Sequence, residues 1–296
     1  MSRIAYVNGR YLPHASAMVH VEDRGYQFAD GIYEVCEVRR GRLIDERRHF
    51  ERMDRSLQAL RIAWPMAPAA LGVILREVVR RNRVAEGIVY AQVTRGVAPR
   101  EHAFPRTTPS PGLVVTAREI PLAPREARAA VGVSVITVAD NRWQRVDIKS
   151  ISLLPNILAK QQAHDAGAFE AWFVDADGFV TEGSSTNAWI VTGQGVLVTH
   201  PTDRGILRGI TRSVVFDLIA AEGLACEERA FSVAEAHGAR EAFLTSASNT
   251  VMPIVRIDGL PVGDGKPGLL TLRLRSIFER AAEVAPAWST PERRQF

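Results

Sequence analysis

The sequence predicts a mixed α/β (α+β) fold divided into two domains. With 296 residues, of which 46% are hydrophobic and 24% charged, the chain can form two compact globular cores. Stretches typical of strands and of helices occur in both halves, without the strict alternation of a doubly wound sheet. The segment IPLAPR at 120–125 contains two prolines and no hydrophobic periodicity, and it separates the halves.

From this pattern we predict a smaller N-terminal α/β domain at 1–119, a linker at 120–126, a larger C-terminal domain at 127–284 and a mobile tail at 285–296. In the first domain, Asn-Gly at 8–9 and Arg-Gly at 40–41 are typical of hairpin turns. Asp45 is expected to cap a helix that ends near residue 60. The other expected helices lie at 69–82, 154–166, 211–222, from 232, and 269–282, and the other strands at 88–95, 112–119, 131–138, 171–175, 187–191, 224–229, 242–245 and 254–257.

The composition argues against several classes of protein. The net charge is +4, but the arginines are dispersed without aromatic interleaving, which does not favour nucleic-acid binding. No apolar run approaches the roughly 20 residues that span a membrane, and the first residues, MSRIAYVNGR, do not resemble a secretory signal. Two distant cysteines, Cys36 and Cys226, favour a reducing compartment, and we therefore expect a cytoplasmic enzyme.

Lys149 is one of three lysines among 37 basic residues. It lies in the run DIKSIS, whereas Lys160 is expected on a polar helix face and Lys266 in a Gly/Pro turn. Arginine can supply charge at 149, but it cannot supply a deprotonatable amine for covalent chemistry. The pattern therefore makes Lys149 a candidate catalytic residue, with a structural role as the alternative.

Three short polar runs are candidate parts of the same site. Glu182 lies in TEGSSTN, where a carboxylate at a strand end can face a cleft, although a plain turn would look similar. The run LRGITR enters a helix and offers backbone N–H groups and the Thr211 hydroxyl to an anion, unless Thr211 is merely a helix cap. The run LTSASN follows a strand and can present N–H groups to a phosphate.

Two further runs contain candidate substrate contacts. Arg100 and His102 lie two residues apart in a proline-flanked loop, a spacing that suits a carboxylate but also fits solvated side chains. Tyr33 lies at the start of a strand. The run GDGKPG at 263–268 fits a dinucleotide fingerprint, but too little chain follows it for that fold. The sequence lacks zinc-protease, cysteine-cluster and serine-hydrolase motifs, so no metal site is expected.

Taken together, the order of these runs resembles the fold-type IV pyridoxal phosphate aminotransferases, and within them the D-amino-acid (D-alanine) aminotransferases. The likeness covers nearly the whole chain, from about residue 6 to 283. Its strongest stretches are EDRGYQFADGIYEV, VTRGVAPREHAFP, DIKSISLLPNILAKQQAHDAGAFEA, TEGSSTNAW, ILRGITR and the TSAS loop.

The resemblance implies that Lys149 binds pyridoxal 5′-phosphate covalently and, once released, moves the substrate proton. Glu182 would pair with the ring nitrogen, and Leu207 would pack against the ring. It also implies a homodimer in which the carboxylate-binding loop comes from the neighbouring subunit. The resemblance assigns phosphate binding to Arg52, Ile210, Thr211, Ser246, Ala247 and Ser248, and binding of the substrate carboxylate to Tyr33, Arg100 and His102.

The function implied is transfer of an amino group between D-amino acids, such as D-alanine and D-glutamate, and 2-oxo acids by a ping-pong mechanism. Alternatives on the same fold are an L-branched-chain or (R)-amine transaminase, against which the pair Arg100 and His102 argues, and 4-amino-4-deoxychorismate lyase. A non-enzymatic binding module would leave Lys149 and Glu182 unexplained together. Ala247 replaces a threonine that is frequent in the D-amino-acid group.

Overall fold

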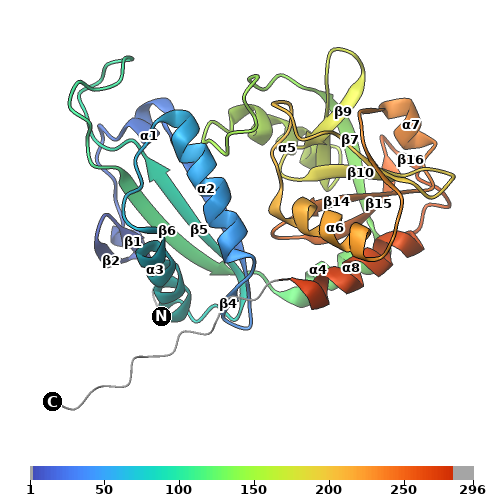
Figure 1. Cartoon of the computed structure of the whole chain (residues 1–296), viewed down its shortest axis with the longest axis horizontal. Helices are drawn as coiled ribbons and strands as arrows, with labels where there is room; N and C mark the ends of the chain where they lie inside the picture. The colour runs from blue at the N-terminus through green and yellow to red at the C-terminus, as the bar shows by residue number, and fades with distance from the viewer. Residues whose placement is uncertain (1–2, 283–296) are drawn as a thin grey trace. The chain divides into compact units, whose positions relative to one another are not determined.

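The computed structural model describes residues 3–282, so the predicted tail at 285–296 lies outside the described residues. Contacts between Cα atoms divide the described chain into two compact units (Figure 1). Unit 1 runs to Ile120, and unit 2 comprises Pro121–Ala282. Each unit combines strands and helices, which confirms the predicted mixed fold class.

Unit 1 is built on a six-stranded sheet in which all neighbouring strands are antiparallel. Helices α2 and α3 pack against this sheet and cover its buried side chains (Figure 1). Asn8 and Gly9 both have positive φ, as the predicted hairpin turn requires. In sheet order the strands are β2 (Arg10–Pro13), β1 (Ile4–Val7), β6 (Gly112–Glu119), β5 (Glu86–Thr94), β3 (Gly31–Arg39) and β4 (Arg42–Leu43), and the helices are η1 (His14–Ser16), α1 (Arg24–Phe28), α2 (Glu46–Leu60) and α3 (Pro68–Arg81).

Two local features of unit 1 differ from the sequence expectation. Asp45 occupies the N-cap position of α2, as expected, but its backbone is left-handed, with φ 53°, and its side chain makes no capping hydrogen bond. The short helix α1 was not expected, because five residues are too few to show a helical period. Its cap is Asp23, whose side chain accepts a hydrogen bond of 2.8 Å from the Gly25 N–H.

Unit 2 is built on a ten-stranded mixed sheet. Strands β15, β7 and β8 run parallel to one another, and α5 connects β7 to β8. The strands follow the order β12 (Cys226–Glu228), β11 (Leu197–Thr199), β10 (Asn187–Val191), β14 (Glu241–Ser246), β15 (Thr250–Ile257), β7 (Val133–Ala139), β8 (Glu170–Val174), β9 (Phe179–Gly183) and β13 (Phe231–Ser232), with β16 (Leu260–Pro261) beside β15. The helices are α4 (Leu122–Val131), α5 (Leu154–Asp165), α6 (Ile210–Ala221), α7 (Val233–His237) and α8 (Leu269–Ala281).

The core of unit 2 explains where its functional loops lie. Apolar side chains of β7, β8, β10, β14 and β15, among them Trp172 and Leu244, form one buried cluster that fixes the strand ends. The loop after β7, at 140–153, carries Lys149, and it leaves the carboxyl end of a parallel strand, where ligands commonly bind in such sheets. Helix α4 begins within the segment 120–126, and its Pro124 is tolerated because it lies in the first turn.

The described residues 3–282 contain neither a candidate membrane helix nor a candidate metal site. Among these residues, no helix is long and apolar enough to cross a membrane. Within the same range, no three His, Cys, Asp or Glu side chains are grouped as a metal site would require.

The start of α8 provides a test of how unit 2 is held together. The buried Glu241 carboxylate accepts hydrogen bonds from the N–H groups of Leu270 and Thr271 and from the Thr271 hydroxyl, at 2.8–3.1 Å. Replacing Glu241 with Ala should lower the free energy of unfolding by about 2 kcal/mol, because these helix-terminal donors lose their acceptor. Urea denaturation measures this loss. The control Glu227→Ala, which breaks an exposed ion pair with Arg229, should change stability by less than about 0.5 kcal/mol.

Candidate active site

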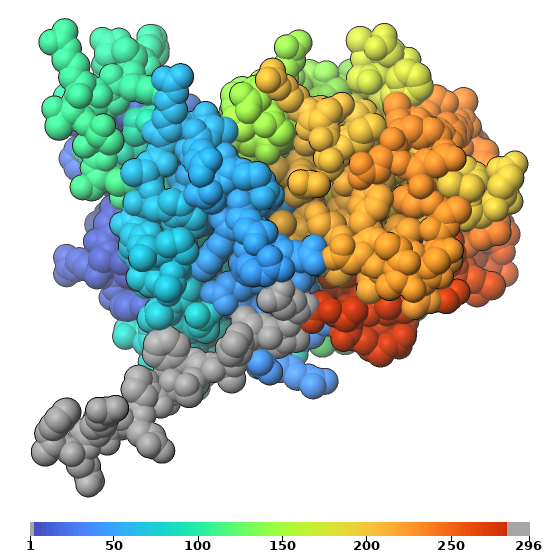
Figure 2. Space-filling model, in the orientation of Figure 1, coloured from blue at the N-terminus to red at the C-terminus, as the bar shows by residue number. Residues whose placement is uncertain are grey.

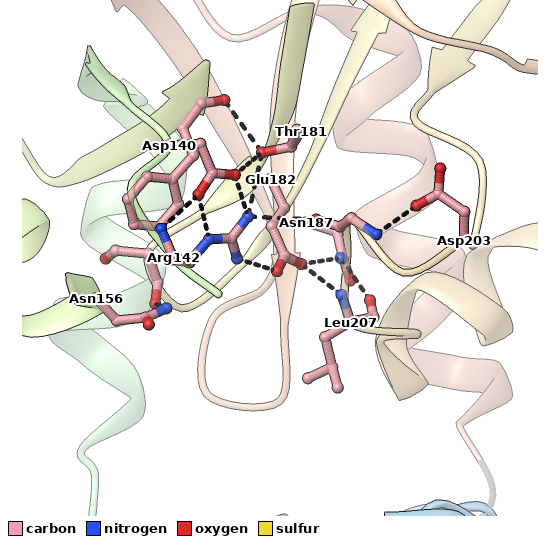
Figure 3. Close-up of polar contacts among 11 residues, drawn as sticks. Asp140, Arg142, Asn156, Thr181, Glu182, Asn187, Asp203 and Leu207 are labelled. Atoms are coloured by element: carbon pink, nitrogen blue, oxygen red, sulfur yellow. Dashed lines mark hydrogen bonds and ion pairs between the residues drawn. The ribbon is translucent and has the colours of Figure 1, made fainter. Parts of the chain in front are cut away.

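Glu182 is the centre of a polar network inside unit 2 (Figure 3). It lies near the end of β9, and its side chain is almost fully buried. One carboxylate oxygen accepts a 2.5 Å hydrogen bond from Arg142, and the other accepts bonds from the Asn187 side chain at 2.9 Å and the Leu207 N–H at 3.1 Å. The carboxylate is therefore fixed in one orientation by donors from three separate segments.

Arg142 is a site residue that the sequence analysis missed. Its guanidinium, with a side chain only 3% exposed, lies between the carboxylates of Asp140 and Glu182 and 4.2 Å from the centroid of the Phe173 ring. It also donates to the Thr181 hydroxyl. Among 34 arginines, no sequence signal distinguishes Arg142, although its place three residues after β7 puts it in the same loop as Lys149.

The pKa values show how charge is balanced here. Burial raises the pKa of Glu182 to about 7, although Arg142 and the Leu207 N–H act to lower it. Burial also acts to raise the pKa of Asp140, but hydrogen bonds and charge from Arg142 outweigh it and leave that pKa below its usual value. Arg142 therefore neutralises Asp140 well and Glu182 incompletely, so the Glu182 carboxylate suits one more cationic partner.

Lys149 belongs to the same electrostatic site. It is half-buried in the loop between β7 and α5, and its charge is among the influences that lower the pKa of Glu182, after the larger effect of Arg142. The structure thus brings together the two residues on which the sequence prediction depends. A lysine beside a buried carboxylate and a buried arginine can bind a molecule that carries both an electrophilic carbon and a basic ring nitrogen.

Hydrogen bonds hold the segment that leads into α6 beside Glu182. Asn187 bonds both the Glu182 carboxylate and the Leu207 carbonyl oxygen, at 2.9 Å each. Gly209 is required at the helix cap, because a Cβ there would lie 2.0 Å from the Asn187 Oδ1. The predicted phosphate contacts Ile210 and Thr211 form the first turn of α6, whose N–H groups lack partners within the helix and favour an anion.

The turn that contains Ser246 lies beside the start of β10, because β14 and β10 are neighbouring strands of the sheet. Residues 246–249 link β14 to β15, and Thr245 of β14 pairs in register with Asn187 of β10. Within the turn, the hydroxyls of Ser246 and Ser248 accept hydrogen bonds of 3.2 Å from Asn249. Ser246, Ala247 and Ser248 therefore lie at the end of the sheet at which β10 begins, which supports their prediction as phosphate contacts.

A second buried carboxylate supports the loop that follows Glu182. Glu170 has 0% exposure, and it accepts hydrogen bonds from the hydroxyls of Ser184 and Ser185. The Lys160 ammonium lies 3.4 Å away and also bonds the Phe169 carbonyl oxygen. Lys160 was expected only on a polar helix face, and the structure shows that it partly neutralises this buried charge.

The remaining predicted residues belong to unit 1. The Arg52 guanidinium on α2 forms two hydrogen bonds with Glu34, at 2.7 and 2.8 Å, and His49 bonds the same carboxylate. Burial acts to raise the pKa of Glu34, but the charge of Arg52 holds it well below its usual range. Tyr33 lies on β3 and stacks on Tyr90. Glu34 thus fixes the orientation of the arginine that is predicted to bind phosphate.

Arg100 and His102 lie together in the long loop between β5 and β6, and both are exposed. Both side chains lie close to the ring of Phe28. The His102 ring lies 5.6 Å and the Arg100 guanidinium 5.1 Å from the Phe28 centroid. The two predicted carboxylate ligands are therefore neighbours in space as well as in sequence.

Comparison with known proteins agrees with this geometry. The chain is 41% identical over 275 residues to a D-alanine aminotransferase of Bacillus licheniformis, covering 93% of this chain and 95% of the relative. It is also 41% identical to the corresponding enzyme of Listeria innocua, with 92% and 93% covered. A branched-chain aminotransferase from the thermophilic archaeon Thermoproteus uzoniensis, solved with norvaline, superposes with a TM-score of 0.82 at 25% identity, covering 95% and 94% of the two chains.

The family comparison spans most of the chain. The sequence profile described as amino-transferase class IV matches residues 31–257, which include most of unit 1 and the Lys149 and Glu182 network of unit 2. With this match and the two relatives above 40% identity, the chain belongs to the class IV aminotransferases.

Proposed function

We propose that this protein is a D-amino-acid transaminase that moves an amino group between D-amino acids, such as D-alanine and D-glutamate, and 2-oxo acids by a ping-pong mechanism. The observation that carries the proposal is the likeness to D-alanine aminotransferases over more than nine-tenths of the chain. The adjacent Arg100 and His102 support it, because they suit the α-carboxylate that all these substrates share.

Class IV aminotransferases use pyridoxal 5′-phosphate, and the residues of this chain fit that cofactor. Its ring nitrogen, when protonated, suits the incompletely neutralised carboxylate of Glu182. Its aldehyde suits the Lys149 amine, and its phosphate suits the first turn of α6. When bound, the cofactor supplies an electron sink for the substrate carbon.

In this proposal each side chain has a separate role in the reaction. Lys149 takes the proton from the substrate Cα and later returns a proton. The general base at this position must therefore be an amine that can lose its own proton. Glu182 keeps a negative charge at the ring nitrogen, and Arg142 holds that carboxylate in place. We assign the phosphate to Ile210, Thr211, Arg52 and the 246–248 turn.

Tyr33, Arg100 and His102 hold the substrate carboxylate in this proposal and so select which face of the substrate Cα meets Lys149. We also propose a homodimer in which the neighbouring subunit supplies that loop. Exposed apolar side chains on α5, among them Leu154, Ile157 and Leu158, support association with another chain. Both cysteines are free, which supports our expectation of a cytoplasmic protein.

The first test is the visible spectrum of the purified holoenzyme. D-Alanine should abolish the band of the bound cofactor, and 2-oxoglutarate should restore it, because the two half-reactions are reversible. L-Leucine and (R)-1-phenylethylamine in parallel cuvettes should leave the band intact. Bleaching by either of these alone would assign the protein to the corresponding rival transaminase, and no response to all three would favour the lyase.

Replacement of Lys149 with Arg should keep a cation but remove the amine. We expect turnover of D-alanine to fall by at least about a thousandfold, because a guanidinium cannot serve as the base. The matched control Lys266→Arg alters an exposed lysine in the 263–268 turn and should leave turnover unchanged. Steady-state rates compare the three proteins, and an active Lys149→Arg variant would contradict the assignment.

Glu182 should also make stability depend on pH in the cofactor-free protein. Burial raises its pKa from 4.5, the value expected for the unfolded chain, to about 7 in the fold, so unfolding releases its proton between these pH values. Stability should therefore fall as pH rises from 4.5 to 7, and the penalty should persist above 7. Glu182→Gln lacks this penalty, and its advantage over the wild type should grow by about 3 kcal/mol across the window.

Urea denaturation at several pH values measures that difference. The cofactor should reduce it, because a protonated ring nitrogen stabilises the charged form of Glu182. An advantage that stays constant from pH 4.5 to 7 would mean that Glu182 keeps an ordinary pKa in the fold.

A further inference from the structure

The loop at 95–111, called here the clamp loop, carries Arg100 and His102 and projects from the surface of unit 1 (blue-green in Figure 2). An exposed loop of this length would ordinarily sample many conformations. Its first residues are instead tied to the segment around α1. The Arg24 N–H donates to the Gly96 carbonyl oxygen at 3.0 Å, and the Arg95 N–H donates to that of Asp30 at 3.0 Å.

The Arg24 side chain extends this attachment to the middle of the clamp loop. Its guanidinium is 3% exposed and donates to the carbonyl oxygens of Glu101, at 2.5 Å, and of His102, at 3.4 Å. Its Nε donates to the Asp30 carboxylate at 2.8 Å. One buried side chain therefore connects a fixed anion to the backbone of the two residues that follow Arg100.

Asp30 also binds Arg95 at the base of the clamp loop, at 2.7 Å. Burial acts to raise the pKa of Asp30, but hydrogen bonds from Arg95 and Arg24 outweigh burial and leave that pKa below its usual value. The carboxylate thus stays charged over the neutral pH range and continues to orient both guanidiniums.

Phe28, the last residue of α1, provides a second support. The His102 ring meets it edge-on at 5.6 Å, and the guanidiniums of Arg100 and Arg24 lie 5.1 and 4.8 Å from its centroid. A cation near the face of an aromatic ring is attracted by the negative charge of that face. Phe28 therefore restrains both predicted carboxylate ligands without competing for their N–H groups.

We propose that Arg24 and Phe28 are positioning residues that hold Arg100 and His102 ready for the substrate α-carboxylate. This inference rests on the proposed function, in which those two residues bind that group. Preorganised ligands lose less conformational freedom when substrate binds, so the support should act on carboxylate-bearing molecules alone.

The test compares two reagents that differ mainly in the carboxylate. Aminooxyacetate and methoxyamine both carry an aminooxy nitrogen that reacts with the bound cofactor, but only aminooxyacetate has a carboxylate. Stopped-flow absorbance of the holoenzyme gives the two rates and their ratio. Arg24→Met and Phe28→Leu should each lower this ratio by about tenfold, through the aminooxyacetate rate alone, as expected when charged contacts are weakened but not removed.

The variants also separate positioning from general damage. Arg24→Lys, which keeps the cation near Asp30, should recover part of the ratio, and the KM for D-alanine should rise in Arg24→Met with little change in kcat. The control Arg76→Met breaks another ion pair of unit 1, with Glu46, and should keep the wild-type ratio. If Arg24→Met does not fold, the reagent ratios of Phe28→Leu and Arg24→Lys test the inference.

Either of two results with the variants would overturn the inference: an unchanged ratio in both of them, or an equal loss for both reagents. A wild type that reacts with D-alanine but shows no preference for aminooxyacetate would also overturn it, while leaving D-amino-acid transamination intact. A wild type that fails to react with D-alanine would instead overturn the proposed function.

Discussion

The buried pairing of Glu182 with Arg142 is the interaction on which the site of unit 2 depends. A carboxylate removed from water is costly unless donors replace its hydration, and here the replacement comes from Arg142, Asn187 and the Leu207 N–H. Each donor belongs to a different part of the chain. The hydrogen bonds to the Glu182 carboxylate therefore also fix the positions of the loop after β7, the start of β10 and the segment that enters α6.

The incomplete neutralisation of Glu182 has a functional consequence. Burial raises the pKa of Glu182 to about 7, although Arg142, which also pairs with Asp140, acts to lower it. In the proposed function, a protonated ring nitrogen is the further cation that pairs with this carboxylate. Under the proposed function, the cofactor-free fold is therefore less stable at neutral pH than it would be with a fully neutralised carboxylate at this position.

The sequence was sufficient for the elements whose signals are local. The Asn8-Gly9 turn, the helix from Glu46 to Leu60 and the α/β character follow from turn chemistry and hydrophobic period. Lys149 could be singled out because lysine is rare in this chain. Arg142, Glu170 and Arg24 could not, because their roles depend on contacts with residues 14 to 78 positions away, which no local pattern reveals. Asp45 shows the converse, since a suitable capping residue there adopts a left-handed backbone instead.

The choice between arginine and lysine has a physical explanation at these positions. Arg24, Arg52 and Arg142 are all buried beside carboxylates, where burial favours loss of a proton. A buried guanidinium remains charged and can donate hydrogen bonds to two acceptors at once. A buried lysine could become neutral and would then lose its ion pair with the carboxylate. In the proposed mechanism the residue at 149 forms a covalent bond and acts as the base, and both roles need an amine rather than a guanidinium. Arginine therefore serves at the three positions where a deeply buried cation must persist, and the proposed covalent chemistry explains why residue 149 is a lysine instead.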